Sequence, residues 1–292
     1  MPCVTGRAVL LGALLLGALL LAALLLAALL LAPAAGAAPA AEAWPRWEVH
    51  DPASTRRVDH APWARWLGAH VITDSPDGIH RVAYGRVSPA DRAALEAYVR
   101  DLVAVPVDGL NRDEQLAYWI NLYNALTVQV VLAHYPVESI RDIDISPGWF
   151  ADGPWDARLL TVAGERLSLN DIEHRILRPL WRDPRIHYAV NCASLGCPNL
   201  QSVPYDAQRI DAQLDAAARA FVNHPRGVRF ADGELVVSSI YAWFQADFGG
   251  TAQGVIRHLL AFAEPTLAER LRRHAGGFDD AYDWRLNEAA AH

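Results

Sequence analysis

Cys192 and Cys197 are the residues of this chain best suited to chemistry. They flank a run of small residues in the segment NCASLGCP, which indicates an exposed loop held by the elements around it. A cysteine becomes a nucleophile when a nearby base or positive charge converts it to the thiolate. Cys192 is therefore a candidate nucleophile for a hydrolase or acyl transferase that acts on a peptide or an amide.

Two histidines are candidates for the base that would activate Cys192. His174 follows Asp171 by three residues, so both share a helix face, and a carboxylate close to a histidine orients its ring and raises its basicity. His187 and Cys192 have opposite parity, so in a regular strand they point to opposite faces and meet only if the strand breaks at Asn191. We therefore expect His174 to be the base and Asp171 to be its neighbour.

Asn121 and Asn124 lie three residues apart in the apolar segment YWINLYNALTVQVVLAHY. This spacing places both amides on one helix face, and burying them costs free energy unless they form hydrogen bonds. One interpretation is that they bond to backbone groups of nearby loops. The other is that they line a polar site, where one of them orients the imidazole or donates to an oxyanion.

The two cysteines also fit a disulfide, because exported proteins live where disulfides persist. Four intervening residues allow the ring to close if the turn brings the Cα atoms within about 7 Å. A bonded Cys192 is not a nucleophile, so the disulfide excludes the thiol enzyme. A zinc site with His187 is disfavoured because the spacing matches no zinc pattern, and neither a metal nor a cofactor is expected. A redox-active pair is disfavoured because the usual two-residue spacing is missing.

The elements that must position these residues are a strand and two helices. Alternating apolar residues predict a strand over 186–191, directly before the cysteine loop. A capping signal at Asn111 predicts a helix that reaches His134, and its apolar surface on nearly every side indicates burial. A third element, a helix that carries His174, begins near Ser168 or Asn170 and ends at Pro179.

The rest of the pattern predicts further helices and two hairpins. Helices are expected over 88–103, 206–223 and 251–274, and hairpins over 159–167 and 228–237. Residues 42–87 form an irregular lead-in segment, and the domain proper covers 88–292. The predicted fold class is α+β: a helix-rich single domain with a small, mostly antiparallel sheet.

Residues 1–41 have the pattern of an export signal. Arg7 precedes an uninterrupted run of Ala, Leu, Val and Gly over 8–32, and small-residue cleavage sites such as Ala35-Gly36-Ala37 follow. The apolar run is long enough to span a bilayer, so an uncleaved N-terminal anchor is the alternative. In both cases we expect the remaining chain to be periplasmic or extracellular.

Composition restricts the partners. The chain has 292 residues, a net charge of −7 and 26 basic residues, all of them Arg. Removal of the signal takes away one Arg and no acid, so the charge becomes more negative. The acidic balance and the scattered Arg exclude nucleic acid as an expected partner. Contact with a membrane is expected only through residues 1–41. The remaining chain of about 250 residues is long enough to bury a hydrophobic core without disulfides or structural metals.

Several stretches resemble the bacterial branch of an uncharacterised family, catalogued as domain of unknown function 547. They include YWINLYNAL at 118–126, LSLNDIEH at 167–174, DPRIH at 183–187 and YDWRLN at 282–287. The resemblance covers roughly 110–290. The family is defined by sequence and not by a reaction. A distant kinship with papain-like or transglutaminase-like folds is a fold-level analogy, and papain-like enzymes carry their thiol at the start of the buried helix, where this chain has asparagines.

Two hypotheses of function follow. The leading one is a cysteine-dependent hydrolase or acyl transferase of the cell envelope, with Cys192 as nucleophile. The alternative is a non-catalytic periplasmic or extracellular module with a Cys192–Cys197 disulfide. It would bind a peptide or envelope polymer through a groove near the asparagine helix, with Trp149 and Trp155 as aromatic contacts. A thiol count on the folded protein separates the two.

Overall fold

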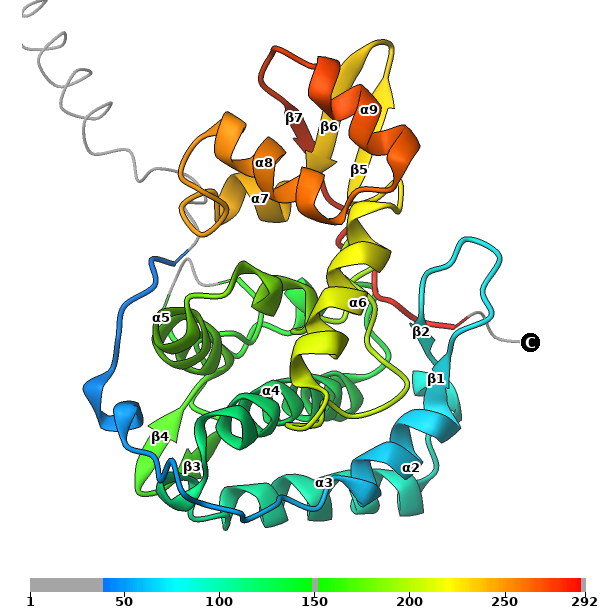
Figure 1. Cartoon of the computed structure of the whole chain (residues 1–292). Coiled ribbons are helices and arrows are strands. Elements are labelled where there is room, and N and C mark those ends of the chain that lie inside the picture. The colour runs from blue at the N-terminus through cyan, green and yellow to red at the C-terminus, as the bar shows by residue number, and fades with distance from the viewer. Residues whose placement is uncertain (1–38, 149–151, 290–292) are drawn as a thin grey trace, which may run out of the picture. The chain divides into compact units, whose positions relative to one another are not determined.

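Helices dominate the computed structural model, which describes residues 39–148 and 152–289 (Figure 1). The apolar run over 8–32 and Trp149 therefore lie outside the described residues. From Pro39 onward the chain forms one compact unit. Its α-helices are α2 (Ala61–His70), α3 (Pro89–Val103), α4 (Arg112–His134), α5 (Arg178–Trp181), α6 (Ile210–Val222), α7 (Ser239–Trp243), α8 (Ala252–Phe262) and α9 (Pro265–Arg273).

Helix α4 is the centre of the larger hydrophobic cluster. Asn111 caps it by accepting the backbone N–H of Glu114 at 2.9 Å, as the capping signal predicts. The helix is buried along most of its length because its apolar residues face every side. It is long and apolar enough to cross a bilayer, yet it is buried within the protein, which is typical of a central core helix.

The lead-in segment before residue 88 is more ordered than its composition predicts. It contains a 3₁₀ turn, η1 (Pro45–Glu48), and helix α2, and it supplies Trp47, Trp63 and Trp66 to the core around α4. Helix α3 follows with Ser88 as its N-cap and Pro89 in its first turn, as predicted. Further 3₁₀ turns lie at η2 (Tyr84–Arg86), η3 (Val107–Gly109) and η4 (Ile140–Asp142).

Three small sheets complete the fold and confirm the α+β class. The strands are β1 (Val71–Ile72), β2 (Arg81–Val82), β3 (Leu160–Val162), β4 (Glu165–Leu167), β5 (Val228–Ala231), β6 (Glu234–Ser238) and β7 (Asp279–Ala281). The pairs β1–β2, β3–β4 and β5–β6 are antiparallel, whereas β7 adds to β6 in parallel. The sheet content is thus mostly antiparallel, but it is divided among separate sheets.

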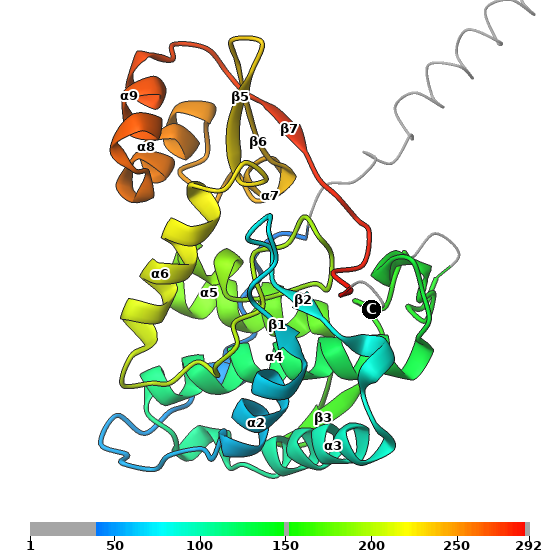
Figure 2. The ribbon, with the colours of Figure 1, turned by 90° about the vertical axis from the view of Figure 1, so that its right-hand side faces the viewer.

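A second hydrophobic cluster lies around the three-stranded sheet. Phe221 of α6, Val237 of β6 and Leu259 of α8 belong to it. Figures 1 and 2 show β5–β7 with α8 and α9 at one end of the unit and α2–α4 at the other, while α6 runs between them. The chain then returns from β7 toward β2, where Val82 donates to the carbonyl of Asn287.

The predicted strand over 186–191 is wrong. Residues Pro184–Tyr188 form a 3₁₀ helix, η6, because Asp183 caps it and Pro184 favours a first helical turn. Residues 186–191 are all buried, so the alternation of apolar and polar residues does not correspond to a buried and an exposed face of a strand. The predicted helix end at Pro179 is wrong as well. A π-helix, η5 (Asp171–Leu177), leads into α5, where Pro179 lies in the first turn and needs no N–H.

Candidate functional site

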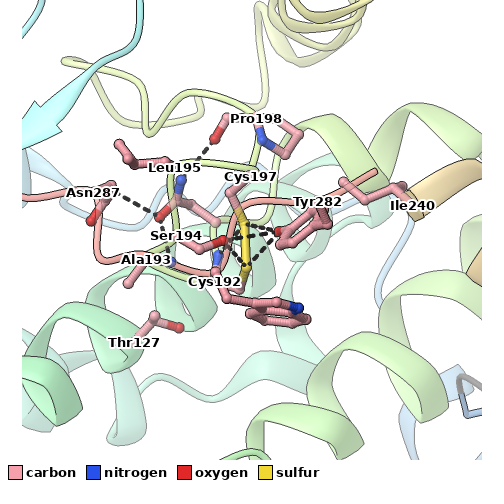
Figure 3. The surroundings of a disulfide bond; sticks show 12 residues. Thr127, Cys192, Ala193, Ser194, Leu195, Cys197, Pro198, Ile240, Tyr282 and Asn287 are labelled. Carbon is pink, nitrogen blue, oxygen red and sulfur yellow. Dashed lines mark hydrogen bonds between the residues drawn. A yellow bond between two sulfur atoms is a disulfide. The ribbon is translucent and has the colours of Figure 1, made fainter. Parts of the chain in front are cut away.

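The loop 191–198 is closed by a bond between the sulfurs of Cys192 and Cys197, whose Cα atoms lie 6.2 Å apart (Figure 3). Ala193 lies in the left-handed region with φ of 60°. Asn191 supports this turn, because its Oδ1 accepts the N–H of Ala193 at 2.9 Å and its Nδ2 donates to the carbonyl of Pro198 at 2.7 Å. The expected loop is therefore present, and its cysteines form a disulfide.

Asn121 and Asn124 bond to the backbone of loops that cross α4. Nδ2 of Asn124 donates to the carbonyl of Ala189 at 2.9 Å, and its Oδ1 accepts the N–H of Asn191 at 2.8 Å. Asn121 makes the same pair of bonds to the N–H and carbonyl of Tyr205. Both amides use their oxygen and nitrogen in this way, so the structure supports the interpretation that they fix loops. Asn124 in particular fixes the start of the disulfide loop.

Asp171 and His174 share the π-helix, but no bond joins them. The carboxylate of Asp171 accepts the N–H and the hydroxyl of Ser168 and pairs with Arg158 and Arg175. Nδ1 of His174 instead accepts a hydrogen bond from Arg178 at 3.0 Å. Burial lowers the pKa of His174 to about 4. Its ring is therefore neutral and already occupied by an Arg, which makes it a poor general base.

His187 bonds to a carboxylate that the sequence did not single out. Its Nε2 lies 2.7 Å from Oδ2 of Asp247, which also accepts Nε–H of Arg178 at 2.6 Å. Burial of Asp247 favours its protonated form, but the bonds from His187 and Arg178 outweigh burial and hold the pKa of this carboxyl below its usual range. The ring of His187 stacks on Phe244 with centroids 4.4 Å apart. Asp247 is 60 residues away in sequence, and no spacing rule links the two.

Glu173 lies close to both histidines. Its Oε1 is 3.7 Å from Nδ1 of His187 and 3.8 Å from Nδ1 of His174. The Glu173 charge adds to burial in raising the pKa of Tyr123 and of Tyr282. Within the described part of the chain, Nδ1 of His187 has no hydrogen-bond partner. Among the same residues, no three His, Cys, Asp or Glu side chains are arranged to hold a metal ion.

An aromatic cluster lies beside the disulfide. It consists of four partly exposed rings, those of Trp155, Trp243, Tyr282 and Trp284. Trp284 is central: its ring centroid lies 4.7 Å from that of Tyr282, 5.5 Å from that of Trp243 and 5.8 Å from that of Trp155. Of these four rings, only Trp155 was proposed from the sequence as an aromatic contact.

Backbone hydrogen bonds hold the C-terminal part of the aromatic cluster against the disulfide loop. Leu195 and Gly196 donate to the carbonyls of Arg285 and Asp283, each at 2.8 Å, and Asn287 donates to Ala193 at 2.9 Å. Tyr282 and Trp284 are therefore positioned by the loop that the disulfide closes. The site as a whole consists of an aromatic surface beside a cross-linked loop and a buried cluster of histidines and carboxylates on η5, η6 and the segment after α7.

An α+β unit with this site matches a known family over part of its length. Residues 107–222 match the model of a family described as "Protein of unknown function, DUF547". The match spans α4, the π-helix, the disulfide loop and α6, whereas Trp243, Tyr282 and Trp284 lie beyond it. A search of curated proteins and a search of solved structures each gave no match.

Proposed function

We propose that this chain is an exported binding domain whose aromatic cluster holds a neutral glycan segment of the cell envelope. One observation carries the proposal: four partly exposed aromatic rings from three segments of the chain meet beside a loop closed by a disulfide. Rings that are rigid and already in place lose little conformational entropy when a ligand binds.

The alternative of a thiol hydrolase or acyl transferase has less support. It needs a thiolate at Cys192, and that sulfur is bonded to Cys197. It also needs a base beside that sulfur, and the side chains within hydrogen-bond distance of Sγ of Cys192 are the hydroxyls of Ser194 and Tyr282. Kinship with papain-like enzymes adds nothing to it, because α4 carries no cysteine.

The chemistry of the surface favours a neutral ligand with flat apolar faces. Indole and phenol rings offer apolar faces with N–H or O–H groups at their edges. A sugar ring has a C–H face that packs on such a surface and hydroxyls that bond at its rim. The net charge of −7 disfavours a polyanion, and Arg141, which lies 5.3 Å over the ring of Trp284, is paired with Asp152.

The pattern of residues 1–41 and the disulfide support the exported location. A basic start followed by an apolar core and small residues is typical of a secretory signal. A disulfide persists in the periplasm or outside the cell, where the cytosolic reducing systems do not act. N-terminal sequencing of the protein purified from its host tests whether the segment is cleaved or kept as an anchor.

The binding proposal is tested with a soluble tetramer of N-acetylglucosamine. We expect it to change the tryptophan fluorescence of the oxidised protein with a Kd of about 1 mM or below, a typical strength for a small, exposed ligand surface. Trp284→Ala should weaken binding about tenfold or more, because this ring contacts the other three and its loss opens the surface.

Trp181→Ala is the matched control. Trp181 is also partly exposed, but it packs under Arg112 and is not part of the aromatic cluster. We expect its affinity to stay within about twofold of the parent value. No binding of the tetramer, or equal loss in both variants, contradicts the proposal, and binding of an envelope peptide in place of the tetramer would replace glycan as the ligand class.

A further inference from the structure

The two sulfurs of the disulfide have unequal surroundings. Cys197 is 3 % exposed, whereas Cys192 is partly open to solvent. Sγ of Cys197 lies 2.9 Å from the backbone N–H of Cys192 and 3.2 Å from the hydroxyl of Tyr282 (Figure 3). The enclosed sulfur thus has a backbone N–H aimed at it that the open sulfur lacks, and the two sulfurs share the phenol of Tyr282. The open sulfur is the one that an external reagent can reach.

The hydroxyl of Tyr282 is held as a donor to the sulfurs. It lies 3.1 Å from Sγ of Cys192, and a disulfide sulfur has no proton to give, so the phenol donates. Its oxygen in turn accepts the hydroxyl of Ser194 at 3.0 Å. Burial raises the pKa of Tyr282, which keeps the phenol protonated at neutral pH.

Charges of both signs act on this phenol. Arg226 donates to the carbonyl of Leu195 at 2.8 Å and so lies over the disulfide loop, where its positive charge favours an anion. Glu173 and Asp283 act in the opposite direction on Tyr282. The groups in direct contact with Sγ of Cys197 are the backbone N–H of Cys192 and the hydroxyl of Tyr282, and both can donate to a negative charge there.

We propose that the Cys192–Cys197 pair is a thiol-exchange site, at which a small thiol attacks Cys192 and Cys197 leaves as the stabilised thiolate. In the first step a bond forms between the attacking sulfur and Sγ of Cys192, the bond between the two protein sulfurs breaks, and its electron pair passes to Sγ of Cys197. A second small thiol then attacks the sulfur of the first, which releases Cys192. Two small thiols are oxidised to their disulfide, the protein pair is reduced, and both thiol protons end on the protein sulfurs.

Two features of the site fit this direction of attack. Exchange is faster when the leaving sulfur is the better-stabilised thiolate, and here that sulfur is the enclosed one. The open sulfur is also the one that would carry the mixed disulfide, so the adduct faces solvent. None of these steps uses the aromatic surface as a ligand site, so the inference does not depend on glycan binding.

The test treats the oxidised full chain with about 5 mM glutathione near neutral pH, a condition that reduces accessible disulfides only. Samples are quenched with acid and alkylated, and mass spectrometry then locates the modified cysteine. We expect exchange without loss of the circular dichroism of the folded protein, and a glutathione adduct on Cys192. Tyr282→Phe should slow the first step about tenfold, because it removes one donor to the leaving thiolate.

Tyr241→Phe is the matched control, since its hydroxyl bonds to that of Tyr188 and contacts no sulfur. Its rate should stay within about twofold of the parent rate. In the single-thiol variants treated with glutathione disulfide, which the protein thiolate attacks with release of one glutathione, Cys197→Ser should form the adduct about tenfold faster than Cys192→Ser, which keeps only the enclosed sulfur. A disulfide that resists glutathione until the protein unfolds, an adduct on Cys197, or an unchanged rate in a folded Tyr282→Phe would each overturn the inference.

Discussion

At the scale of single residues, the two asparagines of α4 act as backbone substitutes inside the core. Each amide meets one N–H and one carbonyl of a loop, which is the pairing that a neighbouring strand would otherwise supply. Such groups are costly to remove, because the loop atoms that they satisfy are themselves buried. Asn124 holds the loop that leads directly into Cys192.

Asn124→Ala should therefore lower the free energy of unfolding by about 2–4 kcal/mol. The substitution leaves the carbonyl of Ala189 and the backbone N–H of Asn191 without their hydrogen-bond partner and opens a small cavity. Urea denaturation measures the change. Gln129→Ala on the same helix is the control, because Gln129 is partly exposed and its Oε1 has no partner among the described residues. A loss below about 1 kcal/mol for Asn124→Ala would show that water replaces the amide there.

The residues that accompany His187 could not be predicted in the same way. The asparagine spacing is local to one helix, so the sequence alone predicts that both amides share a face. Asp247 reaches His187 only because the segment after α7 packs on η6, which is a tertiary contact. Glu173 is adjacent to His174 in the sequence, but its closeness to His187 depends on a π-helical turn that no local sequence pattern predicts.

At the scale of elements, predictions succeeded where a local signal is nearly sufficient. Helices α3 and α4 begin at their caps, and the hairpin turns at Ala163-Gly164 and Asp232-Gly233 lie where expected. The prediction of a strand over 186–191 was wrong because the helix-starting signal of Asp183-Pro184 competes with the apolar alternation. All six residues are buried, so the periodicity of apolar residues does not distinguish a strand from a helix here.

The two hairpin turns provide a comparison within one chain. Both have positive φ at their two central residues: 48° and 87° at Ala163-Gly164, and 51° and 89° at Asp232-Gly233. Ala is strained in this region, whereas Asn and Asp tolerate it. Ala163→Asn should therefore stabilise the protein by about 0.5–1 kcal/mol, and Asp232→Ala should destabilise it by a similar amount. Both sites are exposed, so packing changes little.

Thermal unfolding of the two variants measures this difference. Opposite shifts of the midpoint are expected, upward for Ala163→Asn and downward for Asp232→Ala. Shifts of the same sign would mean that the turn conformation does not determine the effect.

At the scale of the whole molecule, three histidines in different places share one electrostatic condition. Burial lowers the pKa of His60, His174 and His258 to about 4 in each case. Each ring has a bonded partner: the hydroxyl of Tyr98 for His60, Arg178 for His174, and the hydroxyl of Tyr188 for His258. The folded protein therefore keeps three imidazoles neutral at pH values where the same rings, exposed to solvent in the unfolded chain, would be protonated.

This condition predicts a loss of stability in mild acid. The unfolded chain binds protons at these histidines below pH 6.5, while the folded chain resists them until about pH 4, so the free energy of unfolding falls over that interval. Urea denaturation at several pH values should show a loss of about 1–2 kcal/mol per histidine.

Two histidine variants test the assignment. His258→Gln should reduce the total loss of unfolding free energy by the contribution of one histidine, about 1–2 kcal/mol. His134→Gln, at an exposed position, should leave the loss unchanged. The pKa of Asp247 is lowered, so its contribution to stability is lost only below the ordinary carboxyl range and does not change the free energy of unfolding between pH 6.5 and 4. Equal stability at both ends of the interval would mean that these rings are open to protons in the folded state.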